Sequence, residues 1–184
     1  MPARALLGYI ALLICAAGAT SVAGATNARD GSHDMDFALG KWRTDVTSFK
    51  DPFNHPEQTA RMGGTKSVRP LWNGKAFIEE IEADGPGGHW EAANLFLYNP
   101  NTHQWSQNYV DSSEGRLDSS PAIGEYRDGN IEFYWQAKVD GRAALERGLW
   151  SDIKPNSHTY TVARSNDGGR TWHISFVAHL TRIQ

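Results

Sequence analysis

Residues 128–141 read DGNIEFYWQAKVDG, a stretch that begins and ends with the same Asp-Gly pair. Asp-Gly readily adopts the positive φ angles that a tight β-hairpin requires. Between the two pairs every second residue is apolar: Ile131, Phe133, Trp135, Ala137 and Val139. Alternation of this kind is typical of a strand with one buried face. The stretch therefore predicts one strand that is joined to both of its neighbours by tight hairpins.

The same punctuation recurs along most of the chain. Turn signals occur at Asn73-Gly74, Asp84 to Gly88, Asn99 to Asn101, Glu114-Gly115, Lys154 to Asn156 and Asp167 to Gly169. They enclose segments of roughly 8 to 12 residues and predict about ten strands, with almost no room for a packed helix. Closing such a meander removes its exposed edges. We expect an all-β, antiparallel, up-and-down barrel, with an open or sandwich-like sheet as the alternative.

The final segment shows the alternation most clearly, through Trp172, Ile174, Phe176, Ala178 and Leu180. Two other segments break the rhythm. Residues 32–39 could form a helical turn capped by Ser32 or Asp34. Residues 50–64 contain two prolines and a Gly-Gly pair and predict a long loop, which is either a lid over the barrel mouth or a disordered segment.

The first 25 residues have the order of a secretory signal peptide. Arg4 precedes an apolar run over residues 5–17, and small residues end at Ala25. A retained membrane anchor would need ~20 apolar residues in a row, and Gly8 and the stretch from Gly18 dilute this run. We expect cleavage after Ala25 and a single domain over residues 26–184, exported to the periplasm or secreted.

The cysteine usage and the charge limit the class of protein. Cys15 is the only cysteine, and Ile14 before it argues against lipid attachment, so the mature domain has no disulfide. The formal net charge is −3 for the whole chain and −4 without Arg4. Because the basic residues are scattered, nucleic acid is an unexpected partner. We expect a small apolar ligand and no stable membrane anchor.

Gly40-Lys41-Trp42, after a short turn, resembles the opening motif of the lipocalins and the wider calycin group. In many of those proteins the Trp closes one end of the barrel, and an Arg of the last strand stacks on it. The resemblance implies that Arg182 stacks on Trp42, a cation–π contact worth ~1 kcal/mol.

The fuller resemblance is to a family of uncharacterised bacterial domains with a calycin-like barrel. The matching positions are Phe37 to Trp42, Arg69 to Trp72 with Gly74, Tyr98 with Pro100 and Trp105, Arg147 with Trp150 to Ile153 and Pro155, and Asp167 to Gly169 with Thr171-Trp172. They cover nearly all of the expected mature chain. The resemblance implies the barrel and supplies no activity to transfer.

Residues 165–172, SNDGGRTW, fit the Asp-box pattern of sialidase propellers. Asp and Ser oxygens can accept hydrogen bonds from turn amides, and Gly takes a positive φ. Propellers carry one copy per blade, whereas this chain has one in all. We expect Asp167 and Trp172 to staple a hairpin.

Catalytic and metal motifs are missing from the sequence. There is no Gly-x-Ser-x-Gly elbow, no phosphate-binding Gly-rich loop and no cysteine nucleophile. His173 and His179 lie six residues apart on one strand, a span of ~20 Å that is too long for one metal ion. We expect no metal and no cofactor. Haem bound through His179 is the alternative, because barrel relatives of the calycins bind haem.

Three polar residues interrupt apolar strand faces: Glu79, Asn94 and Glu146. Buried carboxylates are costly unless they are paired or serve a ligand. If these faces point inward, the interior carries polar groups that orient a ligand. The alternative is that Glu79 pairs with an interior arginine such as Arg164, or that Glu79 and Glu146 face solvent.

These observations favour a binding module for a small apolar or amphipathic ligand. We expect its site to combine the aromatic side chains of Trp72, Tyr109 and Trp135 with Glu79, Asn94 and Glu146. One alternative is a structural or interaction domain whose barrel is filled with side chains. A second is a hydrolase or isomerase in which Glu79 and Glu146 converge as acid and base.

Overall fold

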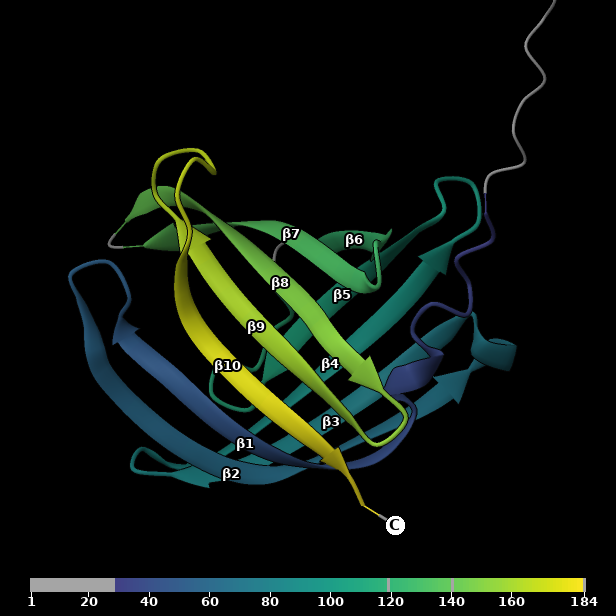
Figure 1. Cartoon of the computed structure of the whole chain (residues 1–184), viewed down its shortest axis with the longest axis horizontal. Coiled ribbons are helices and arrows are strands. Elements are labelled where there is room, and N and C mark those ends of the chain that lie inside the picture. Colours follow the sequence, from purple (N-terminus) through teal and green to yellow (C-terminus); the bar gives the residue numbers. More distant parts are fainter. Residues whose placement is uncertain (1–28, 119, 140, 184) are drawn as a thin grey trace, which may run out of the picture.

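The computed structural model describes residues 29–118, 120–139 and 141–183, and most of this backbone is extended. Ten strands in the described residues form one closed antiparallel barrel, in which each strand pairs with its sequence neighbours and β1 pairs with β10 (Figure 1). The predicted all-β, up-and-down barrel is confirmed. The signal peptide predicted over residues 1–25 lies outside the described residues.

The strands follow one another with short connections, apart from residues 112–121 between β5 and β6 and residues 166–172 between β9 and β10. They are β1 (Gly40–Asp51), β2 (His55–Leu71), β3 (Ala76–Gly85), β4 (Gly88–Asn99), β5 (Gln104–Asp111), β6 (Ala122–Arg127), β7 (Asn130–Val139), β8 (Arg142–Lys154), β9 (Ser157–Ser165) and β10 (His173–Arg182). Two 3₁₀ turns, η1 (Asp36–Ala38) and η2 (Trp72–Gly74), accompany them. No helix in the described part of the chain has the length and apolarity needed to cross a membrane.

The hairpin between β6 and β7 forms as the Asp-Gly pair predicts. Asp128 and Gly129 have φ angles of 51° and 87°, which match the twist of the flanking strands. Directly after this turn, Ile131 and Phe133 point into the barrel and are completely buried. The alternation in β7 therefore reports the inner and outer faces of the wall correctly.

The long loop predicted over residues 50–64 is wrong. Only residues 52–54 connect β1 to β2, and β2 pairs with β1 from His55 onward. Pairing with β3 begins at Gly63, so the first half of β2 pairs on one side only, with β1. Most of its side chains are exposed on both faces, so this half shows no apolar alternation. Backbone pairing with β1 holds the segment as a strand.

Two smaller expectations also need correction. A bulge between Ile174 and Phe176 shifts the register of β10 against β9. It turns Ser175 inward, and Ile174 is 48% exposed although the alternation placed it inside. At η1 the N-terminal cap is Met35, with no side-chain hydrogen bond, so capping by Ser32 or Asp34 is wrong.

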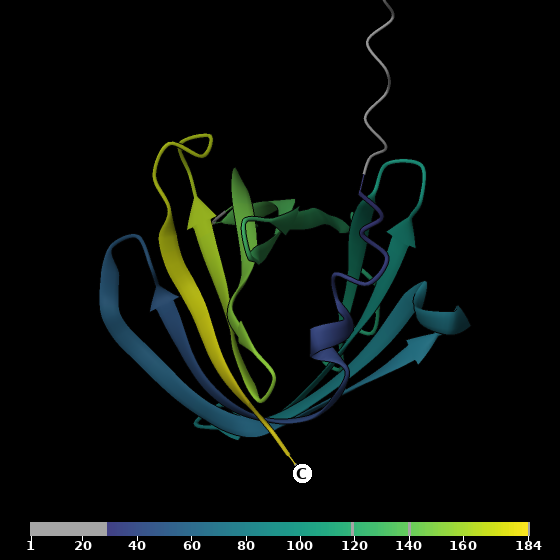
Figure 2. The same cartoon turned by 45° about the vertical axis from the view of Figure 1, so that its right-hand side comes forward.

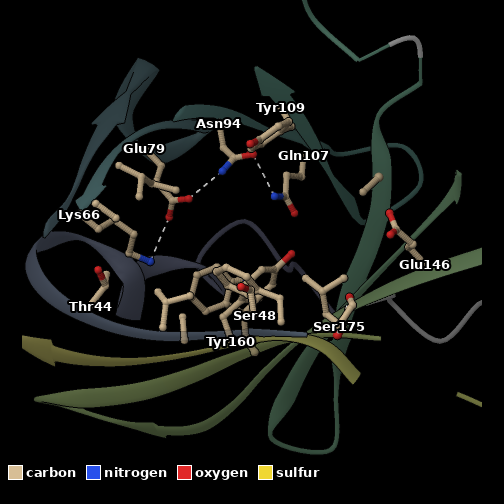
Figure 3. Close-up of a pocket in the computed structure, with 18 of the residues that line it drawn as sticks. Thr44, Ser48, Lys66, Glu79, Asn94, Gln107, Tyr109, Glu146, Tyr160 and Ser175 are labelled. Carbon is tan, nitrogen blue, oxygen red and sulfur yellow. Dashed lines mark hydrogen bonds and ion pairs between the residues drawn. The ribbon is translucent and has the colours of Figure 1, made fainter. Parts of the chain in front are cut away.

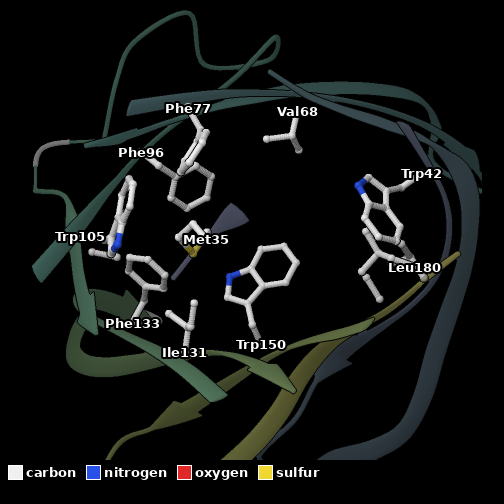
Figure 4. Close-up of a cluster of buried hydrophobic side chains, with 13 residues drawn as sticks. Met35, Trp42, Val68, Phe77, Phe96, Trp105, Ile131, Phe133, Trp150 and Leu180 are labelled. Atoms are coloured by element: carbon white, nitrogen blue, oxygen red, sulfur yellow. The ribbon is translucent and has the colours of Figure 1, made fainter. Parts of the chain in front are cut away.

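Residues 29–39 close one end of the barrel. Figure 2 shows η1 inside the outline of the strands. Met35 and Ala38 are buried there, and the main chain is held by side chains of the wall: Trp105 Nε1 donates to Gly31 O at 3.0 Å, and Trp42 Nε1 donates to Ala38 O at 2.8 Å. The core packs against this plug and includes Phe77, Phe96, Trp105, Ile131, Phe133 and Trp150 (Figure 4).

The Asp-box segment staples the β9–β10 hairpin, as predicted. Asp167 Oδ1 accepts hydrogen bonds from the backbone N–H groups of Arg170 and Thr171, each at 3.0 Å. Ser165 Oγ donates to the same carboxylate at 2.8 Å, and Trp172 Nε1 donates to Gly169 O at 3.1 Å. The backbone N–H of Thr171 is the main cause of a lowered pKa at Asp167.

Candidate functional site

The barrel contains a cavity of about 530 Å³. Its walls are largely aromatic and aliphatic, from residues that include Phe49, Ile81, Trp90, Trp135, Trp150, Tyr160 and Phe176. Lys50, Asp118 and Ser120 line the cavity and are also exposed, so it reaches solvent at the end of the barrel away from η1. The interior is therefore a pocket with one closed end.

The residues with a predicted structural role hold that closed end. The guanidinium of Arg182 lies 4.1 Å from the centroid of the Trp42 ring, which confirms the predicted stacking. Arg182 also donates to Pro155 O at 2.8 Å and Leu39 O at 2.7 Å. Gly40 has a φ of 108°, and a Cβ there would lie 2.6 Å from Arg182 Nη1. Glycine is favoured at position 40 because of the positive φ and because a side chain there would collide with Arg182.

A chain of polar side chains runs along the inner face of the neighbouring strands from β2 to β5 (Figure 3). Lys66 Nζ lies 3.0 Å from Glu79 Oε2. Asn94 Nδ2 donates to Glu79 Oε1 at 2.8 Å, and Gln107 Nε2 donates to Asn94 Oδ1 at 2.9 Å. Lys66, Glu79 and Asn94 are each 3% exposed, and all members of this polar chain line the cavity.

This polar chain lies on the apolar core. On each of the four strands, the inward residue two positions from the polar member is buried and apolar: Val68, Phe77, Phe96 and Trp105. None of these four lines the cavity. On the other side of the polar chain, Ile81 and Tyr109 belong to the cavity wall. The polar chain is therefore the floor of the pocket.

Burial acts strongly on Lys66. Removal from water lowers the pKa of its ammonium, and the charge of Glu79 opposes this effect. The ammonium also lies 4.2 Å from the centroid of the Trp150 ring, a favourable position for a cation. Lys66 thus depends on the carboxylate and the indole to remain charged in the interior.

A second ion pair lies elsewhere in the wall. Arg164 Nε donates to Glu146 Oε1, because the register of β8 and β9 places the two residues opposite each other. The alternative that Glu79 pairs with Arg164 is wrong, since Glu79 pairs with Lys66. Figure 3 shows Glu79 and Glu146 on opposite sides of the cavity. Each carboxylate has its own cation, an arrangement that does not favour a joint role as acid and base.

Five of the six predicted ligand-binding residues line the cavity: Glu79, Asn94, Tyr109, Trp135 and Glu146. Tyr109 donates from its hydroxyl to Asp111 Oδ2 at 3.2 Å, and burial raises its pKa. Trp72 is the exception. It lies in η2 outside the wall and is 69% exposed, so its placement in the interior is wrong. The turn at Asn73-Gly74 carries Trp72 out of the strand alternation.

Sequence reasoning missed several polar residues that line the cavity, among them Thr44, Lys66, Gln107 and Tyr160. A signal for Gln107 was present, because Trp105, Gln107 and Tyr109 alternate in β5. On its face, Lys66 has Gly64 and Val68 as nearest neighbours, so the local alternation around it is weak. Its inward direction follows from pairing with Trp42 on β1, which no local pattern reports.

No histidine is among the described residues that line this pocket. His179, the alternative haem ligand, is exposed, and its Nδ1 lies 3.3 Å from Thr159 Oγ1. In residues 29–118, 120–139 and 141–183, no three His, Cys, Asp or Glu side chains form a cluster suited to a metal ion. The polar groups that face the cavity are mainly hydroxyls, amides and the two ion pairs.

Fold and cavity together define a ten-stranded antiparallel barrel of the lipocalin-like or calycin-like class. The S-type phycobiliprotein lyase CPES from Guillardia theta has this kind of fold: it matches 85% of this chain and 94% of its own with a TM-score of 0.55 and 12% identity. The barrel EF1p2_mFAP2b bound to DFHBI matches 83% of this chain and 99% of its own (TM-score 0.46, 9% identity). A de novo designed fluorescence-activating β-barrel matches 84% and 99% (TM-score 0.44, 11% identity).

No protein-family model and no curated protein matches this sequence. At 12% identity, the similarity to the phycobiliprotein lyase concerns the fold alone.

Proposed function

We propose that this barrel binds a small, mostly apolar or amphipathic molecule in its cavity. The observation that carries the proposal is the cavity of about 530 Å³ with aromatic walls and a polar floor. Ligand pockets commonly measure roughly 300–1,000 Å³ and combine apolar walls with a few placed polar groups. A barrel packed solid with side chains would leave no such volume, so the cavity speaks against the filled-barrel alternative.

The polar floor supports binding over a purely structural interior. Burying charged groups costs free energy, and an apolar substitute for a buried ion pair is often neutral or stabilising. Lys66 and Glu79 are nevertheless placed where the cavity begins, on top of an apolar core that needs no charge. This placement is expected if the pair orients a ligand.

The proposal can be tested with N-phenyl-1-naphthylamine, a neutral apolar dye that becomes fluorescent on leaving water. We expect saturable binding to the purified domain. Ala178 is buried and lines the cavity, so Ala178→Phe should fill it and weaken binding by tenfold or more. Ala93 lies on the outer face, and Ala93→Phe is the matched control that should bind as the wild type does. Equal binding by Ala178→Phe would contradict the proposal.

A natural ligand can be sought by native mass spectrometry of protein purified from its own host. A retained small molecule would appear as a mass above that of the chain and would be lost from Ala178→Phe. The absorbance spectrum of the same sample tests the haem alternative, which requires a Soret band.

We further propose that the protein is an exported member of the uncharacterised bacterial calycin-like family, with residues 1–25 as the signal. The proposal rests on the charged, apolar and small-residue order of these positions. Mass spectrometry of the protein in the periplasmic or extracellular fraction should find a chain that begins at residue 26. An intact N-terminus in a cytoplasmic fraction would contradict export.

A further inference from the structure

The carboxylate of Glu79 determines which way the hydrogen bonds of the polar floor run. Glu79 is paired with Lys66, and an ionised carboxylate only accepts hydrogen bonds. Asn94 must therefore turn its NH₂ group toward Glu79 and its oxygen toward Gln107. Gln107 must in turn present its NH₂ group to Asn94, which leaves its own oxygen at the end of the chain. No amide in this chain can be reversed without losing a hydrogen bond.

The two ends of the polar chain have hydrogen-bonding capacity left over. At the β5 end, Gln107 Oε1 is buried and has no hydrogen-bond partner among the described residues. At the β2 end, the ammonium of Lys66 has three N–H donors, and its contact with Glu79 uses one side of the group. Thr44 Oγ1 is also buried without a partner in the described chain, and Thr44 and Lys66 both line the cavity. The floor therefore offers donors at one end and an acceptor at the other.

Unpaired buried polar atoms are unfavourable, so a ligand that pairs with them gains affinity and specificity. The charge of the lining limits what this ligand can be. Lys50, Lys66 and Arg164 are balanced by Glu79, Asp118 and Glu146. A ligand that brought a net charge to the floor would disturb a paired and buried system. The part of the ligand that contacts the floor should therefore be uncharged.

We propose that the barrel takes a neutral aromatic or polycyclic ligand with its hydrogen-bonding groups at the floor, where an acceptor of the ligand meets Lys66 and Thr44 and a donor meets Gln107. This inference rests on the proposed binding function and deepens it, because it names the ligand class and its orientation. An amphipathic ligand would thus enter with its polar groups first. Its apolar body would lie between the aromatic walls formed by Trp135, Tyr160 and Phe176.

Four matched naphthalenes test the pattern. 6-Acetyl-2-naphthol carries a carbonyl acceptor and a hydroxyl donor. 2-Acetyl-6-methoxynaphthalene lacks the donor, 2-naphthol lacks the carbonyl, and 2-methoxynaphthalene lacks both. Dissociation constants are measured by displacement of N-phenyl-1-naphthylamine. We expect 6-acetyl-2-naphthol to bind at least fivefold more tightly than either singly deleted compound, since one net hydrogen bond contributes about 1 kcal/mol.

Two variants assign the ends of the floor. Gln107→Leu should abolish the advantage of the hydroxyl over the methoxy group and leave the advantage of the acetyl group. Thr44→Val should reduce the acetyl advantage and leave that of the hydroxyl. Gln136→Leu and Thr47→Val, on the outer face, are the matched controls and should change neither ratio. Ratios within one variant remain informative even if the substitution weakens all binding, and circular dichroism confirms that each variant is folded.

The outcomes separate the two proposals. If the dye binds and the four compounds bind with affinities within twofold of one another, or do not displace it, the floor does not select its ligand and this inference is overturned. The same follows if Gln107→Leu leaves the hydroxyl ratio unchanged. If neither the dye nor any naphthalene binds, the proposed binding function itself fails.

Discussion

The ammonium of Lys66 and the carboxylate of Glu79 lie 3.0 Å apart, with 3% and 4% of their side chains exposed. They come from non-adjacent positions of neighbouring strands, since Lys66 is opposite Ile81 and Glu79 is opposite Val68. The stagger of the barrel brings their long side chains together. Each therefore supplies the charge that makes the burial of the other tolerable.

Removing both members of this pair should cost less free energy of unfolding than the two single removals added together. Lys66→Met or Glu79→Leu alone leaves an uncompensated buried charge, and we expect a loss of about 3 kcal/mol in the free energy of unfolding. The double variant should lose clearly less than the sum of the two single variants. Urea denaturation of the four proteins gives the coupling energy. Additive losses would mean that the two groups do not stabilise each other.

Arg182 should not be replaceable by lysine. Its guanidinium stacks on Trp42 while it donates to the carbonyls of Pro155 and Leu39, a planar geometry that an ammonium cannot reproduce. We expect Arg182→Lys to reduce stability by about 2 kcal/mol. Arg127, whose contact with Glu125 is exposed, provides the control: Arg127→Lys should be nearly neutral in the same thermal or urea measurement.

His158 should make the barrel less stable in acid. The pKa of His158 is lowered to about 3, mainly by burial and further by the charges of Lys66 and Arg182. In the unfolded chain the imidazole becomes protonated as the pH falls through about 6.5. Between these values the unfolded state binds more protons, so stability decreases as the pH is lowered, by up to about 1.4 kcal/mol per pH unit.

The contribution of His158 can be isolated with His158→Phe, which keeps an aromatic ring beside Trp42 and Phe37. Urea unfolding of both proteins at pH 7.5, 6, 5 and 4 should show a shallower loss of stability in the variant. Parallel curves would show that His158 titrates with the same pKa in the folded and unfolded states.

The hydrogen bonds of Asp167 should stabilise only the turn between β9 and β10. Asp167→Asn replaces a carboxylate that accepts from two backbone N–H groups and two hydroxyls. We expect the amides of residues 170 and 171 to exchange hydrogen at least tenfold faster, because their acceptor is weakened. Amides of β3 and β4 should retain their protection, and a loss of protection there would mean that the staple supports the whole barrel.

The two tryptophans expected in the ligand site should behave differently. Trp135 lines the cavity, whereas Trp72 is exposed outside it. We expect Trp135→Ala to weaken binding of N-phenyl-1-naphthylamine by about fivefold or more through lost aromatic contact. Trp72→Ala should bind the dye within twofold of the wild type. Equal effects would place the dye outside the cavity.

Local sequence patterns determined most of the wall of this barrel. The Asp-Gly pair at 128–129 specifies a hairpin because both residues tolerate positive φ, and the alternation that follows assigns inner and outer faces. The same parity assigns Glu79, Asn94 and Glu146 to apolar strand faces, and the folded barrel turns these faces inward. The contact between Trp42 and Arg182 followed from the family resemblance of Gly40 to Trp42, since these residues lie at opposite ends of the chain.

Tertiary structure alone decided which polar groups meet. Alternation tells which face a side chain occupies, but the pairing of the strands selects its neighbour. The stagger brings Lys66 to Glu79, and the register of β8 and β9 places Arg164 opposite Glu146. The exposed half of β2 has no apolar face, so only its pairing with β1 makes it a strand. The cavity depends on how all ten strands close around the plug at η1, because an unfilled volume is a property of the whole packed barrel and of no single segment.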